Sequence, residues 1–212
     1  SSDLIDDQQV ERLNDRVERE VASALKPFGY YDPVVSSELT KSERSRDWHV
    51  QISILPGTPI RLRDVSLQLN GSGASDPSLR HIVDSKTLRT GQQLNHAAYD
   101  GLKGELQRTA ATLGYHDAKL LRSELLVDPV NHVADVSIEM QTGERYHFGA
   151  TTIEQNAIQD SLARRYVRYQ ENEPFDATQL LRTQFALDDS QYFSTVEVLP
   201  GEPDRATLAV PV

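Results

Sequence analysis

The stretch Phe28-Gly29-Tyr30-Tyr31-Asp32 decides the fold, because a closely similar stretch returns later as Leu113-Gly114-Tyr115-His116-Asp117. A third version reads Ser190-Gln191-Tyr192-Phe193-Ser194. Self-similarity of this kind is typical of repeated structural modules. Glycine just past an apolar helix favours a left-handed residue that ends the helix, so each stretch is expected to end a helix and open a strand. The third copy lacks this glycine, and its helix is expected to end differently.

A long amphipathic helix is predicted ahead of each stretch. Apolar residues recur at steps of three or four, which gives each helix one apolar face. The predicted faces consist of Val10, Leu13, Val17, Val21, Leu25 and Phe28 in the first copy, of Ala98, Leu102, Leu106, Ala110 and Leu113 in the second, and of Leu180, Leu181 and Phe185 in the third. Asp176 is expected to cap the third helix, with Gln179 three residues on.

Two strands joined by a polar loop are predicted after each helix. Alternating apolar and polar residues, as in 50–54 and 136–140, indicate a sheet with one buried face. The predicted strand pairs are 34–39 with 50–54, 119–127 with 136–140, and 195–199 with 207–210. An opening strand and a short helix come before the long helix in the second and third copies. These opening strands are predicted at 62–69 and 147–153.

The full repeat therefore reads strand, helix, helix, strand, strand. The three copies are placed at residues 1–57, 58–145 and 146–212. The first copy has no opening strand or short helix, so we expect residues upstream of Ser1, or a neighbouring chain, to complete it.

Composition narrows the choice of function. The chain has 32 acidic and 22 basic residues and a formal net charge of −10, which disfavours binding to nucleic acid. It has no cysteine, which excludes disulfides and thiolate chemistry. No apolar run is long enough for a membrane-spanning helix.

The sequence offers no active-site pattern. The six histidines have no metal-ligand spacing, and the acidic stretch that includes Asp188 and Asp189 has no calcium-loop glycine. Asn70-Gly71-Ser72-Gly73 is not followed by the Lys-Ser/Thr of a phosphate loop. We therefore expect no catalytic, cofactor-binding or metal-binding residues, and predict that the chain is not an enzyme.

The order of elements resembles a POTRA repeat. The stretches that carry the likeness are Leu25 to Tyr31, Gly143-Glu144-Arg145-Tyr146-His147-Phe148-Gly149 and Asp189 to Val196. Tandem repeats of this kind are similar to the POTRA segment of the TamA family, in the BamA-type outer-membrane assembly superfamily. The resemblance implies an α+β fold of elongated tandem modules, each a three-stranded mixed sheet covered by two helices.

The resemblance also implies a context. The segment would lie on the periplasmic side of the Gram-negative outer membrane and dock a TamB-like, inner-membrane-anchored partner. It would bind unfolded outer-membrane protein clients, autotransporters included, and guide them to a C-terminal β-barrel of the full-length protein. The alternatives are a POTRA segment of a BamA-like or two-partner secretion protein or, in another class, a periplasmic ligand-binding or hydrolytic domain.

The expected mechanism is addition of a partner strand to an open sheet edge. The strand after each long helix is the expected edge, so 119–127 is a further candidate. The candidate docking residues are Val34, Val35, Ser36, Ser37, Glu38 and Leu39 in the first copy, and Thr195, Val196, Glu197 and Val198 in the third.

Overall fold

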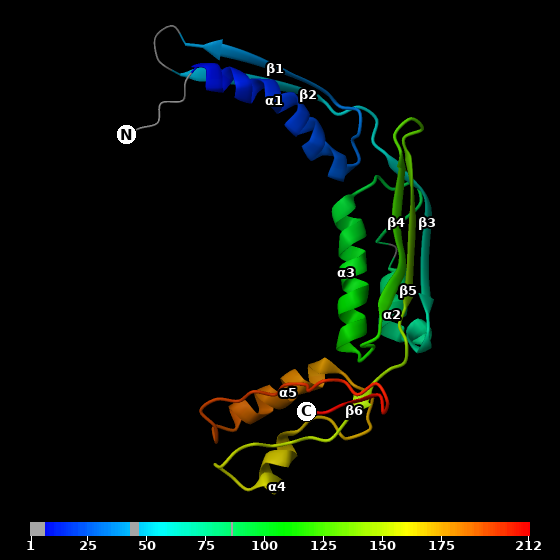
Figure 1. Cartoon of the computed structure of the whole chain (residues 1–212), viewed down its shortest axis with the longest axis vertical. Helices are drawn as coiled ribbons and strands as arrows, with labels where there is room; N and C mark the ends of the chain where they lie inside the picture. Colours follow the sequence, from blue (N-terminus) through cyan, green and yellow to red (C-terminus); the bar gives the residue numbers. More distant parts are fainter. Residues whose placement is uncertain (1–6, 43–46, 86) are drawn as a thin grey trace. The chain divides into compact units, whose positions relative to one another are not determined.

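The computed structural model describes residues 7–42, 47–85 and 87–212, and Figure 1 shows the elements along the chain. In order, they are α1 (Asp7–Leu25), η1 (Lys26–Phe28), β1 (Val34–Lys41), β2 (Trp48–Leu55), β3 (Arg61–Asn70), η2 (Ser72–Ser75), α2 (Pro77–Asp84), α3 (His96–Thr112), β4 (Lys119–Asp128), β5 (Val133–Gln141), β6 (His147–Phe148), α4 (Asp160–Ala163), η3 (Arg164–Tyr166), α5 (Ala177–Asp189) and β7 (Ala209–Val210).

The three long helices form where the apolar spacing predicts them. In α3 the predicted face is buried, with Leu102, Leu106 and Ala110 at most 1% exposed. In α5 the prediction was wrong for two residues, because Leu180 is buried whereas Leu181 and Phe185 are 56% and 65% exposed. Successive helix positions point about 100° apart. Only one of two neighbouring leucines can therefore face the small core beneath α5.

Left-handed residues end all three helical segments. Gly29 and Gly114 have φ angles of 87° and 86°, as the sequence predicts. The expectation of a different exit after α5 was wrong, since Gln191 takes a φ of 58°. The turn after α5 thus has the same left-handed geometry, although glutamine stands where the other two copies have glycine. This conformation costs a non-glycine residue about 1–2 kcal/mol. Asp176 caps α5 as predicted, and its Oδ1 accepts from the backbone N–H of Thr178 at 2.8 Å.

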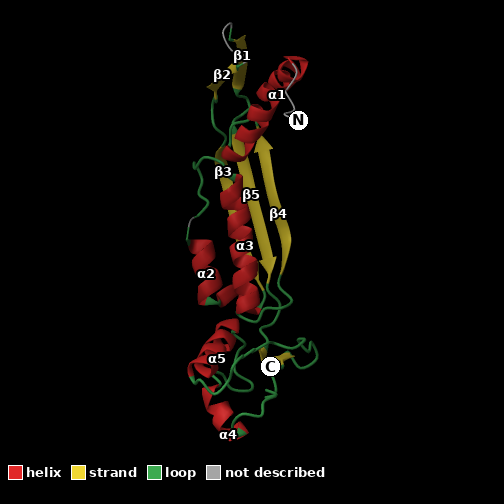
Figure 2. Cartoon of the chain, turned by 90° about the vertical axis from the view of Figure 1, so that its left-hand side faces the viewer, coloured by secondary structure: helices red, strands yellow, loops and turns green. Residues whose placement is uncertain are grey.

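The strands form three separate sheets. β1 and β2 make an antiparallel pair, β3, β5 and β4 make a three-stranded sheet in that order, and β6 and β7 make a short parallel pair. Helices α2 and α3 lie on one face of the three-stranded sheet (Figure 2). The α+β class with a three-stranded sheet and covering helices is thus confirmed.

The strands predicted in the last third of the chain are shortened. β6 covers only the start of the predicted strand 147–153, and the segment 195–199 enters no strand in the described part of the chain. The backbone N–H of Thr152 still donates to the carbonyl of Val212, and the N–H of Val212 to that of Ala150. The pairing of β6 and β7 therefore continues weakly beyond the two named strands.

The chain divides into two compact units. The first consists of Ser1–Val65, Leu88–Gly101 and Glu124–Ser137, and the second of Ser66–Thr87, Leu102–Ser123 and Ile138–Val212. In the second unit, aromatic and aliphatic residues form one core cluster, made of Tyr146, Phe148, Tyr169, Phe175, Leu180 and Val210. By contrast, among residues 8–42 and 47–57 only Gly29 is buried. The first predicted repeat therefore has almost no core of its own.

Candidate docking surfaces

The first repeat is joined to the following residues through the glycine turn at Gly29. The carbonyl of Gly29 accepts from the N–H of Ile60 at 2.7 Å, and the carbonyl of Ile60 accepts from the N–H of Leu94 at 2.9 Å. A Cβ on Gly29 would lie 2.7 Å from the carbonyl oxygen of Leu94. The Tyr31 hydroxyl and His96 Nε2 lie 3.0 Å apart across the same junction. Only glycine fits here without displacing backbone.

The same arrangement recurs after α3. The carbonyl of Gly114 accepts from the N–H of Tyr146 at 2.9 Å, and the carbonyl of Tyr146 accepts from the N–H of Phe175 at 2.9 Å. A Cβ on Gly114 would lie 2.8 Å from the Cβ of Phe175. At both places, the carbonyl of a helix-ending glycine accepts from the N–H of a residue at or near the start of the next predicted repeat.

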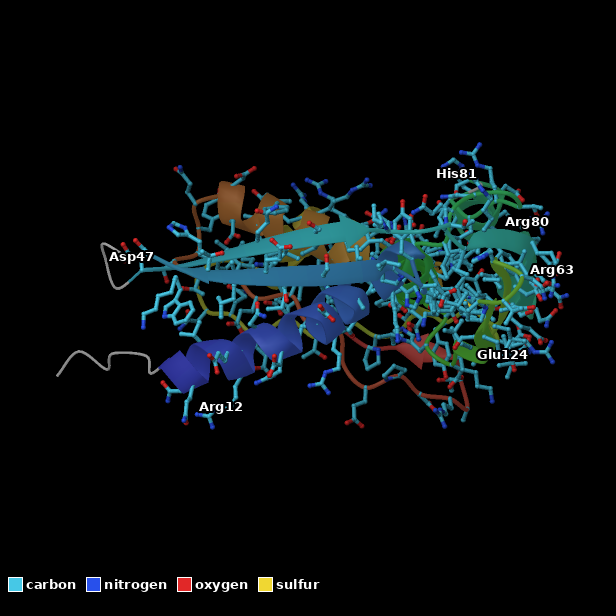
Figure 3. The ribbon with its side chains drawn as sticks, turned by 90° about the horizontal axis from the view of Figure 1, so that it is seen from above. Arg12, Asp47, Arg63, Arg80, His81 and Glu124 are labelled. Atoms are coloured by element: carbon cyan, nitrogen blue, oxygen red, sulfur yellow. The ribbon has the colours of Figure 1, made fainter. Side chains whose placement is uncertain are left out.

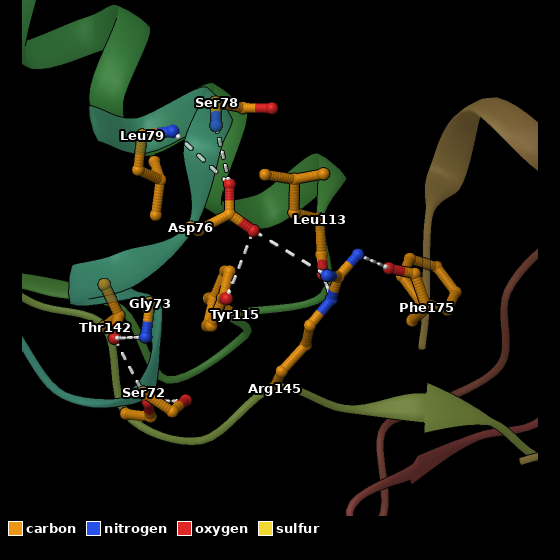
Figure 4. A network of polar contacts seen from close by, with 11 residues as sticks. Ser72, Gly73, Asp76, Ser78, Leu79, Leu113, Tyr115, Thr142, Arg145 and Phe175 are labelled. Atoms are coloured by element: carbon orange, nitrogen blue, oxygen red, sulfur yellow. Dashed lines mark hydrogen bonds and ion pairs between the residues drawn. The ribbon is translucent and has the colours of Figure 1, made fainter. Parts of the chain in front are cut away.

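Arg145 fixes the second junction from the side (Figure 4). Its guanidinium donates to the carbonyls of Leu113, at 2.8 Å, and Phe175, at 3.2 Å. It also lies 3.7 Å from Oδ2 of Asp76, a buried carboxylate that accepts from the Tyr115 hydroxyl at 3.3 Å. One side chain thus ties the end of α3 to residues on both sides of the turn. Neither Arg145 nor Asp76 was expected to have this role.

His116 packs against the same junction. Its ring meets the rings of Tyr146 and Phe175 edge-on, each at a centroid distance of 5.2 Å. Partial burial lowers the pKa of His116, and the charge of neighbouring Asp117 opposes that shift. Asp117 itself accepts from the Tyr146 hydroxyl at 2.9 Å.

The edge of β1 has the hydrogen-bonding pattern that strand addition needs. Val34 pairs with Leu55 and the register continues to Lys41 with Trp48. Beyond it, the N–H of Ser42 donates to the carbonyl of its opposite residue, Asp47, at 3.0 Å. Hydrogen-bonded pairs alternate along an antiparallel ladder. Even-numbered residues of β1 therefore bond to β2, and odd-numbered ones direct their N–H and C=O groups to the outer edge.

The predicted residues of the first repeat all lie in β1. Val35, Ser37 and Leu39 have outward-directed backbone groups and half-buried side chains, whereas Val34, Ser36 and Glu38 are exposed. Among the described residues no strand lies beyond β1 in its sheet. The structure thus brings this half of the candidate site together as an open edge, and β4 is likewise an edge strand of its sheet.

Strand β2 is the second open edge of this sheet, as expected for a repeat without its opening strand. The side chains of Val50, Ile52 and Ile54 are 47%, 43% and 43% exposed. Directly opposite residues share a face of a sheet, so these three side chains lie on the same face as Val35, Ser37 and Leu39. The absence of an opening strand from the first repeat is the signal that predicts this edge.

The predicted residues of the third repeat line a groove rather than a sheet edge. Thr195, Val196, Glu197 and Val198 are among the residues that line a groove of about 670 Å³. Thr151 to Gln155, Tyr169 and Thr183 line the same groove. The prediction of a strand at 195–199 was wrong because no neighbouring backbone lies within hydrogen-bonding distance of this segment in the described chain.

Metal chemistry finds no support in the described residues. No three His, Asp or Glu side chains among residues 7–42, 47–85 and 87–212 gather around a point where a metal ion could bind. None of the helices in these ranges is long and apolar enough to cross a membrane.

Comparison with known proteins agrees with this geometry. The family described as POTRA domain TamA domain 1 matches residues 1–56. The outer membrane protein assembly factor BamA of Neisseria meningitidis serogroup B is 22% identical over 190 residues, covering 85% of this chain and 23% of that protein. The crystal structure of Haemophilus influenzae BamA POTRA3-5 superposes with a TM-score of 0.52 at 15% identity, covering 93% of this chain and 77% of that one.

The three matches differ in what they cover. The TamA family reaches only the first repeat, the curated relative is much longer than this chain, and the solved structure shares the fold. The family model and the solved structure are both of POTRA domains, and the curated relative is a BamA protein. Residues 1–56 therefore match a POTRA family model, and the chain as a whole is similar in sequence to BamA and in fold to its POTRA domains.

Proposed function

We propose that this chain is the POTRA segment of a TamA-type protein on the periplasmic side of the Gram-negative outer membrane. In this proposal it docks a TamB-like partner and unfolded client polypeptides by strand addition. The repeats at 1–57, 58–145 and 146–212 are its three POTRA domains, the first without its opening strand and short helix. The match of residues 1–56 to the first POTRA domain of TamA supports the TamA assignment.

The open edge of β1 is the observation that carries the proposal. Outward N–H and C=O groups at Val35, Ser37 and Leu39 can bond to any extended backbone, whatever its side chains. Such a surface suits a protein that receives many different unfolded clients. The groove beside Thr195 to Val198 is the second proposed client site, since its mixed apolar and polar walls fit a short extended segment.

Proline at position 37 tests the edge directly. The N–H of Ser37 points away from β2, so Ser37→Pro removes an outward donor and leaves the β1–β2 ladder in place. The assay is titration of the chain with the C-terminal periplasmic part of a TamB-like protein. We expect Ser37→Ala to bind as the unmodified chain does and Ser37→Pro to bind at least about tenfold more weakly. Equal binding by the two variants would remove strand addition at β1 from the proposal.

A BamA-like assembly factor is the second candidate, because the matched BamA covers 85% of this chain. The two differ in partner. Absence of any binding to the TamB-like protein by the unmodified chain would reject the TamA assignment in favour of the BamA-like one.

A further inference from the structure

The outer face of α5 carries two large apolar side chains that pack against no core. Leu181 and Phe185 are 56% and 65% exposed, and they lie one helical turn apart on the same face of the helix. Leu180 and Thr183 belong to the other face and are 5% and 2% exposed. Helix α5 therefore has one buried face and one exposed apolar face.

Helices α3 and α5 hold the same place in their repeats. The N–H of Leu94, ahead of α3, and the N–H of Phe175, ahead of α5, make the same junction hydrogen bond at 2.9 Å. These two residues lie 81 positions apart in the sequence, from 94 to 175. With this offset Tyr99 of α3 matches Leu180 of α5, and both side chains are buried. The two helices can thus be compared position by position.

The comparison shows that the repeat does not need the apolar pair. The position of Leu181 corresponds to Asp100 in α3, and that of Phe185 corresponds to Gly104. This face of α3 is uncovered, since Asp100 is exposed and a Cβ on Gly101 would meet no atom within 4 Å. Helix α3 belongs to the middle predicted repeat, so the opening of this face does not depend on where the sequence begins or ends. Apolar residues gathered on such a face indicate contact with another molecule.

Two charges of opposite sign border the apolar pair. Arg182 and Asp189, three residues before Phe185 and four after it, lie on the same side of this face and are exposed. Neither side chain makes an ion pair or hydrogen bond within residues 7–42, 47–85 and 87–212. By contrast, Arg63, labelled in Figure 3, is paired with Asp135. The face therefore offers both an acceptor and a donor of a salt bridge.

We propose that two copies of this chain pair through α5, with the helices antiparallel about a two-fold axis at Phe185. The two Phe185 rings then pack on each other, and Leu181 of each copy packs beside the ring of the other. In this symmetry the same sides of the two helices meet. Arg182 of each copy therefore faces Asp189 of the other, with an offset of one residue, about 1.5 Å along the helix axis. Two equivalent ion pairs flank the apolar contact.

Charge complementarity selects a second copy as the occupant and also selects the register. Moving the axis to Thr183 would bring the two Arg182 side chains within about 3 Å of each other along the helix axis, which is repulsive. A partner helix of a single charge sign would satisfy one of the two bordering charges and repel the other. The isologous contact closes after two copies.

The pairing is expected to be weak and separable from strand addition. One helix face buries less than the roughly 1,600 Å² of a standard interface, so we expect a dissociation constant on the order of 100 μM. The face shares no residue with the proposed docking residues Val34 to Leu39 or Thr195 to Val198. Failure of the dimer would therefore leave the proposed function untouched, and the reverse is also true.

Exchange of the two charges gives the sharpest test, with sedimentation velocity of the 212-residue chain as the assay. Arg182→Asp places two like negative pairs at the interface and Asp189→Arg places two like positive pairs. Each single variant should dimerise at least about tenfold more weakly than the unmodified chain. A mixture of the two variants should form a heterodimer, because every Asp then meets an Arg, and the double variant should dimerise again.

The apolar contact is tested by Phe185→Ala, which should weaken the dimer at least about tenfold. Val130→Ala is the matched control, because Val130 is 87% exposed and lies outside α5, and it should leave the dimer unchanged. Circular dichroism checks that each variant keeps its helices. A monomer at all concentrations up to about 1 mM, a dimer that the charge variants do not weaken, or a mixture of the two charge variants that stays monomeric would each overturn the proposal.

Discussion

Replacement of Gly29 by alanine should destabilise the junction that holds the first repeat. Gly29 and Gly91 have nearly the same backbone conformation, with φ angles of 87° and 84°. They differ in their surroundings. A Cβ on Gly29 would lie 2.7 Å from the carbonyl oxygen of Leu94, whereas a Cβ on Gly91 would meet no atom within 4 Å. Comparing the two alanine variants therefore separates the steric contribution from the conformational one.

The magnitudes follow from these two contributions. The left-handed conformation costs alanine about 1–2 kcal/mol relative to glycine, and this applies to both variants. Overpacking against a rigid carbonyl adds about 1–3 kcal/mol at Gly29 alone. We therefore expect Gly29→Ala to destabilise by about 2–5 kcal/mol and Gly91→Ala by about 1–2 kcal/mol. Gly101 has no positive φ and open space around it, so Gly101→Ala within α3 should stabilise by about 0.5–1 kcal/mol.

The single tryptophan is the natural reporter, because Trp48 lies at the start of β2 in the first repeat. Urea unfolding followed by its fluorescence should give a lower midpoint for Gly29→Ala than for Gly91→Ala, by about 1 M for a slope near 2 kcal/mol per molar. Equal midpoints for the two variants would show that the close approach to Leu94 does not contribute to the loss of stability. The junction would then be more adaptable than its geometry indicates.

Two further predictions concern the second junction. Arg145→Met leaves the carbonyls of Leu113 and Phe175 without their donor and should lower the free energy of unfolding by about 1–3 kcal/mol. Arg165→Met, at an exposed position, should change the melting temperature little, and similar losses in both variants would contradict the role of Arg145. Partial burial lowers the pKa of His116 in the folded chain, so as pH falls the unfolded chain takes up the proton first. The corresponding stability is present above about pH 6.5 and decreases as the pH falls through that value; His116→Phe should flatten this part of a stability-against-pH curve, and an unchanged slope would exclude His116 as its source.

The long elements and the helix-ending glycines could be predicted because their signals are local. An apolar face on α3 and a glycine after it require only the spacing of neighbouring residues. The misplaced side chains of α5 show the limit of such signals: Leu180 and Leu181 are equally apolar, and which one is buried depends on the position of Phe148 and Phe175. The strand predicted at 195–199 failed for a related reason, since a strand exists only where another backbone pairs with it.

The candidate site was half predictable. That β1 follows a long helix and ends a sheet is a property of element order, so Val34 to Leu39 could be placed at an edge from the sequence alone. The open edge of β2 follows from the missing opening strand and not from the alternation of its residues, which is the same as in the buried strand β5. The difference between the two strands lies in what pairs with them, and that information is carried by other parts of the chain. The Arg145 contact with Asp76 is hidden for the same reason, because the two residues are distant in sequence.

The two junctions place different demands on the domains they join. After Gly114 the joined parts each have a packed core, so Arg145 and His116 add to a structure that is already supported. Before Gly29 there is α1 and a two-stranded sheet with almost no buried side chain, and a hairpin of this size is marginal by itself. The first repeat must therefore take much of its stability from contacts outside itself. The glycine turn with the Tyr31–His96 contact supplies one such contact. The open edge of β1 is therefore part of a domain with little internal packing, and a strand added there, as proposed, would stabilise the domain that it binds.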